Sequence, residues 1–343
     1  MTAPGSAKRP GPAAGPGPAS GAQPPPAPDR VVDAQVNLAS LLAIPPAFIE
    51  HQAANVHHRL DAYGLGARLD RVRGQVFSLY EDDDADRLVA EMDEAGVDSA
   101  FLVAPDYSHA ADCKLSQPEL AALHDRVNRR HPGRFHVFWG VDPRGGQAGL
   151  ELFEHCVTQY GFAGMKLYPP CGYSPSDPRL YPYFERCADY GIPVLTHTGP
   201  GWGPLDFTFG RPLLLDRAAR DFPGVDFILG HGGVTHVDEA AQMCAHRPNV
   251  HLDISQFHAV LSAENWQTHV NRLFRAGIAH KILFGTCWPS FRLSESLGGL
   301  LKEFARGAPA VAGLRESERT MIMSGNSLRL LGRTPAEQRG GQR

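Results

Sequence analysis

The sequence predicts an α/β protein folded as a single (β/α)8 barrel, the TIM-barrel architecture. The 343 residues suit one barrel of about 250 residues with additions. Hydrophobic residues make up 43% of the chain, enough for a large core. Short apolar runs alternate with amphipathic stretches along the chain, which indicates parallel βαβ units. Because these runs are almost continuously apolar, they favour a closed barrel over an open sheet.

The elements are predicted from hydrophobic spacing. The strand candidates are 31–34, 97–104, 134–141, 162–168, 192–197, 225–231, 249–255 and 281–286. The helix candidates are 85–95, 117–131, 149–160, 179–190, 210–221, 235–247, 263–276, 293–306 and 316–331. In the first of these helices, Leu88, Met92 and Ala95 share one face, as expected of a helix packed on a sheet.

The chain divides into a barrel and two terminal segments. Residues 1–30 are rich in Pro, Ala and Gly and cannot bury enough apolar surface to offset the entropy lost on ordering. We therefore predict a disordered arm there, and a similar disordered tail at 334–343. The barrel then occupies 31–333. Residues 38–82 form an insertion after the first strand, which we expect to cover one mouth of the barrel.

Composition excludes several classes of partner. The net charge is -4 and no basic stripe is present, which disfavours nucleic acid. No apolar run is long enough to cross a membrane, and the start of the chain lacks the apolar segment of a secretory signal. Six cysteines occur without a CxxC pair, which is typical of reduced thiols in a cytoplasmic protein. We therefore expect a small-molecule substrate.

The chemistry is expected at the carboxyl ends of the strands, where barrel enzymes place their active sites. Polar and aromatic residues gather at these ends. They are Gln35, Asn37, Lys166, Tyr168, His197, His231, Asp253, Cys287 and Trp288.

Several long segments carry a family resemblance in the right order. They include MDEAGVDSAFLVAP (92–105), HPGRFHVFWGVDPR (131–144), FILGHGG (227–233), ILFGTCWP (282–289) and SGNSLRLLG (324–332). Over nearly all of 31–333 the chain resembles the amidohydrolase-related family, in the branch of aminocarboxymuconate-semialdehyde decarboxylase-like enzymes. The resemblance implies a barrel of the metal-dependent hydrolase type, catalysing hydrolysis, decarboxylation or hydration. It also implies pairing into a homodimer.

The metal ligands implied by the resemblance are only partly present. The family uses His-x-His after strand 1, where this chain has Gln35 and Asn37, and an Asp after strand 8, where it has Cys287. Of this set only His197, after strand 5, remains, with His231 after strand 6 as the usual catalytic assistant. Neutral amides bind zinc poorly, and a thiol cannot take the role of the aspartate toward water. We expect a degenerate site with weak or no metal; a weakly bound divalent ion such as zinc is left open.

Three residues are predicted to be catalytic: His197, His231 and Lys166. The two histidines could act as acid, base or electrostatic partner near neutral pH, or be barrel-mouth residues satisfied by their neighbours. Lys166 could bind a substrate carboxylate, or form a structural ion pair with Asp142 or Asp253.

Further roles remain open for residues at the mouth. Cys287 could fill the space of the lost aspartate, ligate a relocated zinc with His197 and His231, or act as a nucleophile. The predicted substrate-binding residues are Tyr168, Trp202, Asp253 and Trp288. Trp202 stands out among them because it lies in a Gly- and Pro-rich loop after His197.

The sequence therefore predicts an amidohydrolase-like hydrolase of a small, carboxylated molecule, with a lost or weakened metal site. Lactonases that work without a metal belong to the branch that the chain resembles. Two alternatives remain: a carboxy-lyase of the same family, and an inactive pseudoenzyme that binds a small molecule or a partner protein.

Overall fold

The computed structural model describes residues 30–260, 263–293, 295–305, 311 and 313–332. Except for Arg30, the terminal segments predicted to be disordered lie outside these ranges. Eight strands form one parallel sheet, in chain order from β1 to β8. They are β1 (Val32–Asn37), β2 (Ser99–Ala104), β3 (Phe135–Val141), β4 (Gly164–Leu167), β5 (Val194–His197), β6 (Phe227–Gly230), β7 (Val250–Asp253) and β8 (Ile282–Leu283).

Backbone hydrogen bonds between the segment at β8 and β1 close the sheet into a barrel. The amide of Ala34 donates to the carbonyl oxygen of Phe284 at 2.8 Å, and that of Cys287 to Gln35 at 2.7 Å. The amide of Asn37 donates to the carbonyl of Trp288 at 2.9 Å. The predicted (β/α)8 barrel is confirmed.

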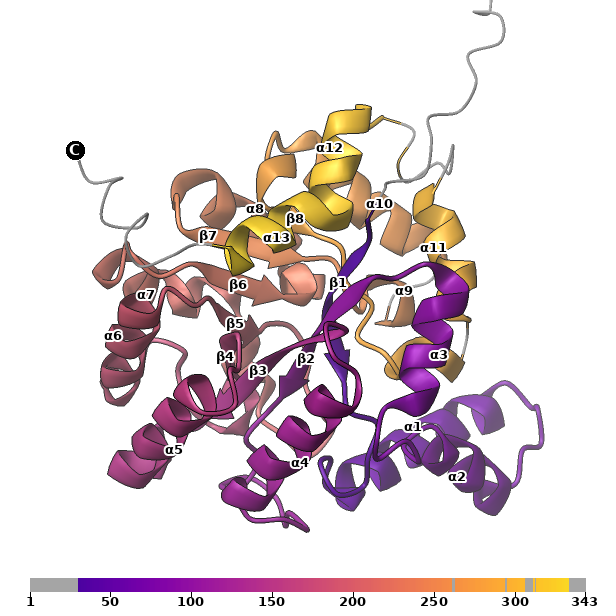
Figure 1. Ribbon diagram of the computed structural model, residues 1–343. Coiled ribbons are helices and arrows are strands. Elements are labelled where there is room, and N and C mark those ends of the chain that lie inside the picture. Colours follow the sequence, from indigo (N-terminus) through magenta and orange to yellow (C-terminus); the bar gives the residue numbers. More distant parts are fainter. Residues whose placement is uncertain (1–29, 261–262, 294, 306–310, 312, 333–343) are drawn as a thin grey trace, which may run out of the picture.

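Helices surround the strands in Figure 1, as expected of βαβ units. They are α1 (Pro46–Ala62), α2 (Leu69–Ser78), α3 (Asp86–Ala95), α4 (Gln117–Arg130), α5 (Gly146–Thr158), α6 (Tyr181–Tyr190), α7 (Asp216–Asp221), α8 (Val237–His246), α9 (Phe257–Val260), α10 (Ala263–Arg275), α11 (Leu297–Ala305), α12 (Glu316–Thr320) and α13 (Asn326–Leu331). Helices α1 and α2 lie side by side at the lower right of Figure 1 and belong to the predicted 38–82 insertion.

Several predicted boundaries were wrong, and three elements illustrate the causes. Strand β1 runs on to Asn37 instead of ending at 34, because its last polar residues still pair within the barrel. The helix expected at 210–221 is reduced to α7, since Pro212 begins a separate 3-10 turn. The helix expected at 316–331 is divided into α12 and α13 by a π-helical turn at Met321–Gly325.

Alternating residues of the strands fill the inside of the barrel. The cluster comprises Val32, Ala34, Phe101, Val103, Phe138, Leu195, Ile228, Leu283 and, from α13, Leu330. In the register of β4 with β5, Lys166 lies beside Leu195. Because successive strand residues point to opposite faces, Lys166 occupies an inward position that is apolar on β5. The fold thus places a lysine, only 1% exposed, inside the barrel.

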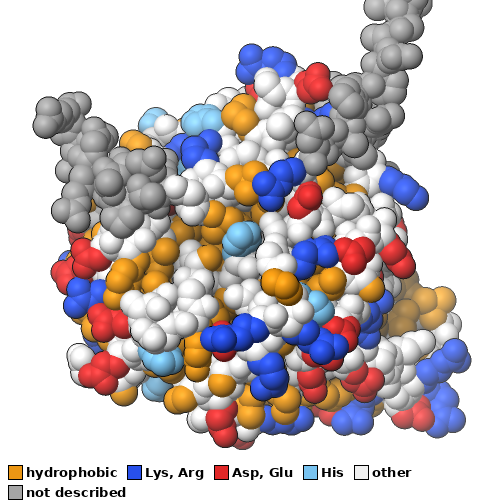
Figure 2. All heavy atoms as spheres, in the orientation of Figure 1, with side chains coloured by type: hydrophobic (Ala, Val, Ile, Leu, Met, Phe, Trp, Pro, Cys, Tyr) orange, Lys and Arg blue, Asp and Glu red, His pale blue; other side chains and the backbone are white. Residues whose placement is uncertain are grey.

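The outer surface carries charges of both signs. On the face shown in Figure 2, basic and acidic side chains are interspersed. Many form exposed ion pairs, such as Arg130 with Asp86 at 2.5 Å, which contribute little to stability. Within the described residues, none of the helices combines the length and apolar character that crossing a bilayer requires.

Candidate active site

A cavity of about 900 Å³ opens at the carboxyl ends of the strands. It brings together most of the residues predicted from the sequence. These are Gln35, Asn37, Lys166, Tyr168, His197, Trp202, His231 and Cys287. Helix α1 contributes Gln52, Val56 and Arg59 to the wall, so the insertion lies over this mouth of the barrel.

Two predicted substrate-binding residues lie outside the cavity lining. Trp288 is completely buried, and its indole nitrogen donates to the Glu91 carboxylate at 2.9 Å. The guanidinium groups of Arg87 and Arg292 lie 5.7 and 5.9 Å from its ring. Trp288 therefore packs between elements and lies outside the cavity lining, and its predicted contact with substrate stays a prediction. Asp253 is also completely buried, and its Oδ1 accepts hydrogen bonds from Ser255 and from the backbone amide of His231.

The two histidines belong to a chain of hydrogen bonds that leads from the cavity into the interior. His231 Nε2 lies 3.1 Å from His197 Nδ1, and His197 Nε2 lies 3.0 Å from the carbonyl oxygen of Pro200. On the other side, His231 Nδ1 lies 2.7 Å from Ser255 Oγ, which contacts Asp253 Oδ1. Asp253 Oδ1 also accepts the backbone amides of His231 at 3.1 Å and Ser255 at 2.9 Å.

These contacts restrict where the protons can reside. A carbonyl oxygen only accepts, so His197 Nε2 must donate to Pro200, and the contact between the imidazoles then holds one proton. If Asp253 is protonated, each hydrogen bond runs outward through Ser255 and His231 to His197, and the chain is neutral. If Asp253 is ionised, the bonds reverse and His197 carries a positive charge. The two arrangements contain the same number of protons and differ only in where they lie.

Burial favours the neutral arrangement. It lowers the pKa of His197 to about 3, assisted by the charge of Lys166, and it lowers the pKa of His231 well below its usual value. Burial also raises the pKa of Asp253. Each shift disfavours the charged form because the group has lost its contact with water. Burial raises the pKa of Asp253 even though its Oδ1 accepts hydrogen bonds from Ser255 and from the backbone amides of His231 and Ser255, which act in the opposite direction.

The side-chain amide of Gln35 can form a hydrogen bond with His231 in either arrangement of the protons. Its amide nitrogen lies 3.2 Å from His231 Nε2, and its buried Oε1 has no hydrogen-bond partner among the described residues. A half-turn of the amide exchanges its donor for its acceptor, so Gln35 can meet His231 Nε2 whether or not that atom carries hydrogen.

Lys166 has no ion pair and no hydrogen bond from Nζ among the residues that the structure describes. The predicted pairing with Asp142 was wrong, because that carboxylate is held by Arg144 at 2.5 Å. Asp253 affects Lys166 only as a nearby charge. Burial lowers the pKa of Lys166 to about 7, with Asp253 and Cys287 acting in the opposite direction. Near neutral pH, the side chain therefore exists in both protonation states.

The thiol of Cys287 accepts hydrogen bonds from amide nitrogens. Asn37 Nδ2 lies 3.4 Å and Gln256 Nε2 lies 3.1 Å from Sγ. The orientation of both amides is fixed by second acceptors, the carbonyl oxygen of Trp288 at 3.1 Å and Ser290 Oγ at 2.9 Å. The side-chain oxygens of Asn37 and Gln256 are consequently not the atoms directed at the sulfur.

A family model described as Amidohydrolase matches residues 98–333. The chain belongs to the amidohydrolase family.

Other similarities are more distant. The 2-keto-4-carboxy-3-hexenedioate hydratase of Sphingobium sp. strain SYK-6 is 27% identical over an alignment of 103 residues. The match covers 25% of this chain and 30% of the hydratase. A dihydroxybenzoic acid decarboxylase from Polaromonas sp. JS666, solved with bound manganese, has a TM-score of 0.57 and 17% identity, covering 88% of this chain and 96% of its own. A probable 2-pyrone-4,6-dicarboxylic acid hydrolase from Acinetobacter baumannii, solved with citric acid bound, has a TM-score of 0.60 and 14% identity. The match covers 89% of this chain and 100% of the hydrolase. At these identities, the structural likeness establishes the fold alone.

The residues of this amidohydrolase do not fit the metal that the family resemblance implies. Asn37 turns its amide nitrogen toward Cys287, so the side chain that replaces a histidine ligand presents a donor. In the described part of the chain, no three His, Cys, Asp or Glu side chains converge to hold an ion. The alternative of a zinc held by His197, His231 and Cys287 therefore has no support in the geometry.

Restoring the family ligands should restore metal binding. The triple variant Gln35→His, Asn37→His, Cys287→Asp places two imidazoles and a carboxylate beside His197, a donor set that suits zinc or manganese. We expect one equivalent of zinc by elemental analysis after dialysis, against substoichiometric zinc in the wild type. The double variant Gln35→His, Asn37→His serves as an intermediate control. Equal zinc contents in the wild type and the triple variant would contradict this assignment of the ligand positions.

Aromatic rings form the wall beside the histidines. Tyr168 lies against His197 with ring centroids 4.4 Å apart, and Tyr107 lies 5.2 Å from Tyr168. Trp202 donates from its indole nitrogen to the hydroxyl oxygen of Tyr107 at 3.2 Å and stacks on Phe48 of α1 at 5.6 Å. The predicted places of Tyr168 and Trp202 at the mouth are thus observed, and the wall suits a planar ligand.

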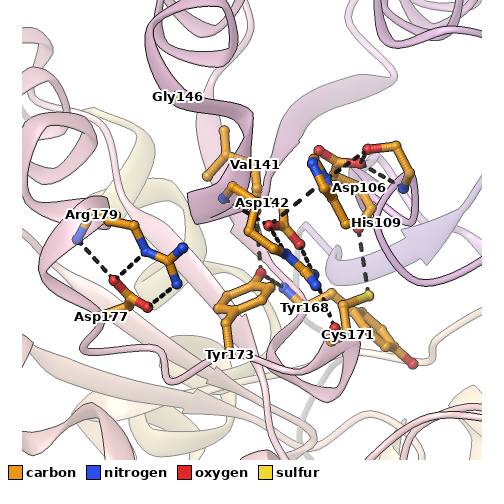
Figure 3. Close-up of polar contacts among 12 residues, drawn as sticks. Asp106, His109, Val141, Asp142, Gly146, Tyr168, Cys171, Tyr173, Asp177 and Arg179 are labelled. Carbon is orange, nitrogen blue, oxygen red and sulfur yellow. Dashed lines mark hydrogen bonds and ion pairs between the residues drawn. The ribbon is translucent and has the colours of Figure 1, made fainter.

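A polar network at the ends of β2, β3 and β4 supports Tyr168 from behind (Figure 3). The hydroxyl of Tyr173 accepts the backbone amide of Tyr168 at 2.7 Å and donates to the carbonyl of Val141 at 3.2 Å. The guanidinium of Arg144 pairs with the Asp142 carboxylate and also donates to the carbonyl oxygen of Cys171 at 2.9 Å. These fully used hydrogen-bonding groups fix the backbone from which Tyr168 enters the cavity.

Sequence reasoning did not assign Gln256 or the cavity face of α1. On α1, Gln52, Val56 and Arg59 follow a helical spacing that places them on one side, a periodicity that is visible within 38–82. Gln256 gave no signal, because it lies just beyond the end of β7 in a left-handed conformation with φ 67°.

Proposed function

We propose that this amidohydrolase hydrolyses a small, carboxylated ester or lactone without a tightly held metal ion. The observation that supports this most directly is the imidazole pair, His197 and His231, on the cavity lining and backed by Ser255 and Asp253. General acid–base catalysis requires a group that can take a proton from water and return it to the leaving oxygen. All ring nitrogens of the pair are engaged in hydrogen bonds, so the contact between His197 Nδ1 and His231 Nε2 has to open toward a bound water before the chain offers such a group.

In this proposal, the hydrogen-bonded chain from Asp253 to His197 moves a proton without leaving a single unpaired charge in the interior. A proton taken up at the imidazole pair can be balanced by a shift through Ser255 to or from Asp253. The buried site therefore avoids the large penalty of an unpaired charge. The logic resembles that of other acid–base constellations, in which a buried carboxyl group supports a histidine.

Lys166 and the aromatic wall supply binding. In its ammonium form, Lys166 is a buried cation without a partner in the described chain, so it would hold a substrate carboxylate or polarise the carbonyl. Tyr168 and Trp202 would pack against the ring of the substrate. A probable 2-pyrone-4,6-dicarboxylic acid hydrolase shares the fold, and the dicarboxylate in its name is the first compound to test.

The test is an assay of chelator-treated protein on carboxylated lactones, including 2-pyrone-4,6-dicarboxylic acid, and on aromatic carboxylic acids. We expect ring opening of a lactone, at a rate that EDTA and dialysis leave unchanged. Restoration of activity only by added metal would overturn the metal-free mechanism. Release of carbon dioxide from an aromatic acid without lactone opening would replace the proposal by the carboxy-lyase alternative. Binding without conversion of any compound would replace it by the inactive binder.

A further inference from the structure

We infer that Lys166 is a carbonyl-reactive amine, which forms an imine with the aldehyde or keto group of a small carboxylated compound bound in the cavity. This is a second chemistry of the same cavity and does not require that the protein hydrolyse anything.

The geometry singles out this lysine. Lys166 takes an inward position on β4 and is 1% exposed, yet it lines the cavity. Its Nζ atom has no hydrogen-bond partner among the described residues. An amine bound to a carboxylate is held as an ammonium ion and is a poor nucleophile, whereas a desolvated, unpaired amine is a good one. The lowered pKa of Lys166, about 7, agrees with this view.

Imine formation balances with the groups present in the cavity. The lone pair of Lys166 Nζ attacks the carbonyl carbon, the π bond to oxygen breaks, and one of the two nitrogen protons passes to the oxygen to give a neutral carbinolamine. The hydroxyl group then takes up a second proton and leaves as water, while the nitrogen forms the double bond to carbon and gives up its last proton, so the two amine protons account for the water released. No oxidant or reductant is consumed.

The walls indicate the class of carbonyl compound. Tyr107, Tyr168 and Trp202 favour a flat ring or a conjugated chain. Arg59 on α1 also lines the cavity, is exposed, and forms no ion pair with a described residue. A guanidinium without a partner is suited to bind a carboxylate. An aromatic aldehyde with a carboxylate remote from the aldehyde combines these features, and 4-formylbenzoate is the simplest probe.

The experiment is reductive trapping. The full-length protein is incubated with 4-formylbenzoate and sodium borohydride, and the adduct is located by intact mass and peptide mapping. We expect one carboxybenzyl group per chain, on Lys166. The variant Lys166→Met should lose it, whereas Lys114→Met, at an exposed lysine, should retain it. An adduct that persists in Lys166→Met, or that spreads over surface lysines without preference for Lys166, would overturn the inference.

Two controls separate imine formation from loss of folding and from loss of carboxylate binding. Lys166→Arg keeps a cation but cannot form an imine, so it should also escape trapping, and thermal denaturation will show that both Lys166 variants are folded. Benzaldehyde lacks the carboxylate, so Arg59→Ala should weaken the trapping of 4-formylbenzoate several-fold but leave that of benzaldehyde unchanged. Equal loss with both aldehydes would contradict the assignment of Arg59. Neither readout measures hydrolysis. Trapping can therefore succeed when the hydrolase activity is absent, and hydrolysis can be observed when trapping fails.

Discussion

His231→Ala is expected to lower kcat for the hydrolysed substrate by a factor of about 10²–10⁴, the usual contribution of a positioned acid–base group. His231 is the central member of the proton chain, since one ring nitrogen contacts His197 and the other contacts Ser255. Its removal separates the cavity from the carboxyl group of Asp253. KM should change less than kcat, because carboxylate binding is assigned to Lys166. Steady-state kinetics on purified variants will measure both.

Two further variants separate catalysis from structure. His258→Ala removes another histidine of the same cavity that is not part of the chain, and kcat should stay within a few-fold of the wild type. Ser255→Ala interrupts the chain one step below His231, so it should lower kcat and also change its pH profile, which a packing defect would not do. Full activity of His231→Ala would remove the imidazole pair from the mechanism.

Lys166→Met is expected to stabilise the fold by roughly 4 kcal/mol at pH 6, while it abolishes carboxylate binding. Folding moves the pKa of Lys166 from 10.5 to about 7, because the ammonium loses its contact with water and gains no ion pair. One pKa unit corresponds to about 1.4 kcal/mol, so burial of the charged form is costly. Methionine has a similar length and no charge, and it adapts to irregular space. Chemical denaturation of both proteins will measure the difference.

The pH dependence of this gain follows from proton linkage. Between about pH 7 and 10.5 the unfolded lysine binds a proton that the folded one has lost, so wild-type stability rises with pH in that interval. Below about pH 7 both states are protonated and the full cost of burial is present. The advantage of Lys166→Met should therefore be greatest below pH 7 and shrink toward pH 10.5. Lys114→Met, at an exposed lysine, should change stability by less than about 0.5 kcal/mol at any pH. A Lys166→Met protein less stable than the wild type at pH 6 would refute the argument.

The strand pattern of the sequence sufficed to predict the barrel, because buried parallel strands are apolar on both faces. The same pattern misplaced the end of β1, because Gln35 and Asn37 are polar and yet belong to the strand. Their backbone groups pair with the segment after β8, a contact about 250 residues away in the chain that no local pattern records. The π-helical turn before Asn326 likewise depends on tertiary packing, since Asn326 donates to the carbonyls of Ala279 and Ile282 at 2.8 and 2.7 Å.

Residue types and strand ends predicted the members of the site, but not their partnerships. His197, His231 and Lys166 all line the cavity, as predicted from their positions at the carboxyl ends of the strands. The contact between the two imidazoles follows from the register of β5 and β6, which pairs His197 with Gly230, the residue before His231. The contact of Asp253 with the histidines depends on Ser255, two residues further along the chain. The position of Trp288 could not be predicted from the sequence, because a side chain just after a strand can turn toward the helices as readily as toward the mouth.

The cavity is assembled from two stretches of chain, of which the family model covers only one. Lys166, His197, His231 and Cys287 lie within 98–333, the part that matches the family, whereas Arg59 and its neighbours on α1 precede it. Reactive groups and the surface that selects a ligand are therefore separable. Mutation could reshape the α1 face and retarget the protein to new compounds, while the inherited proton chain below it stayed intact.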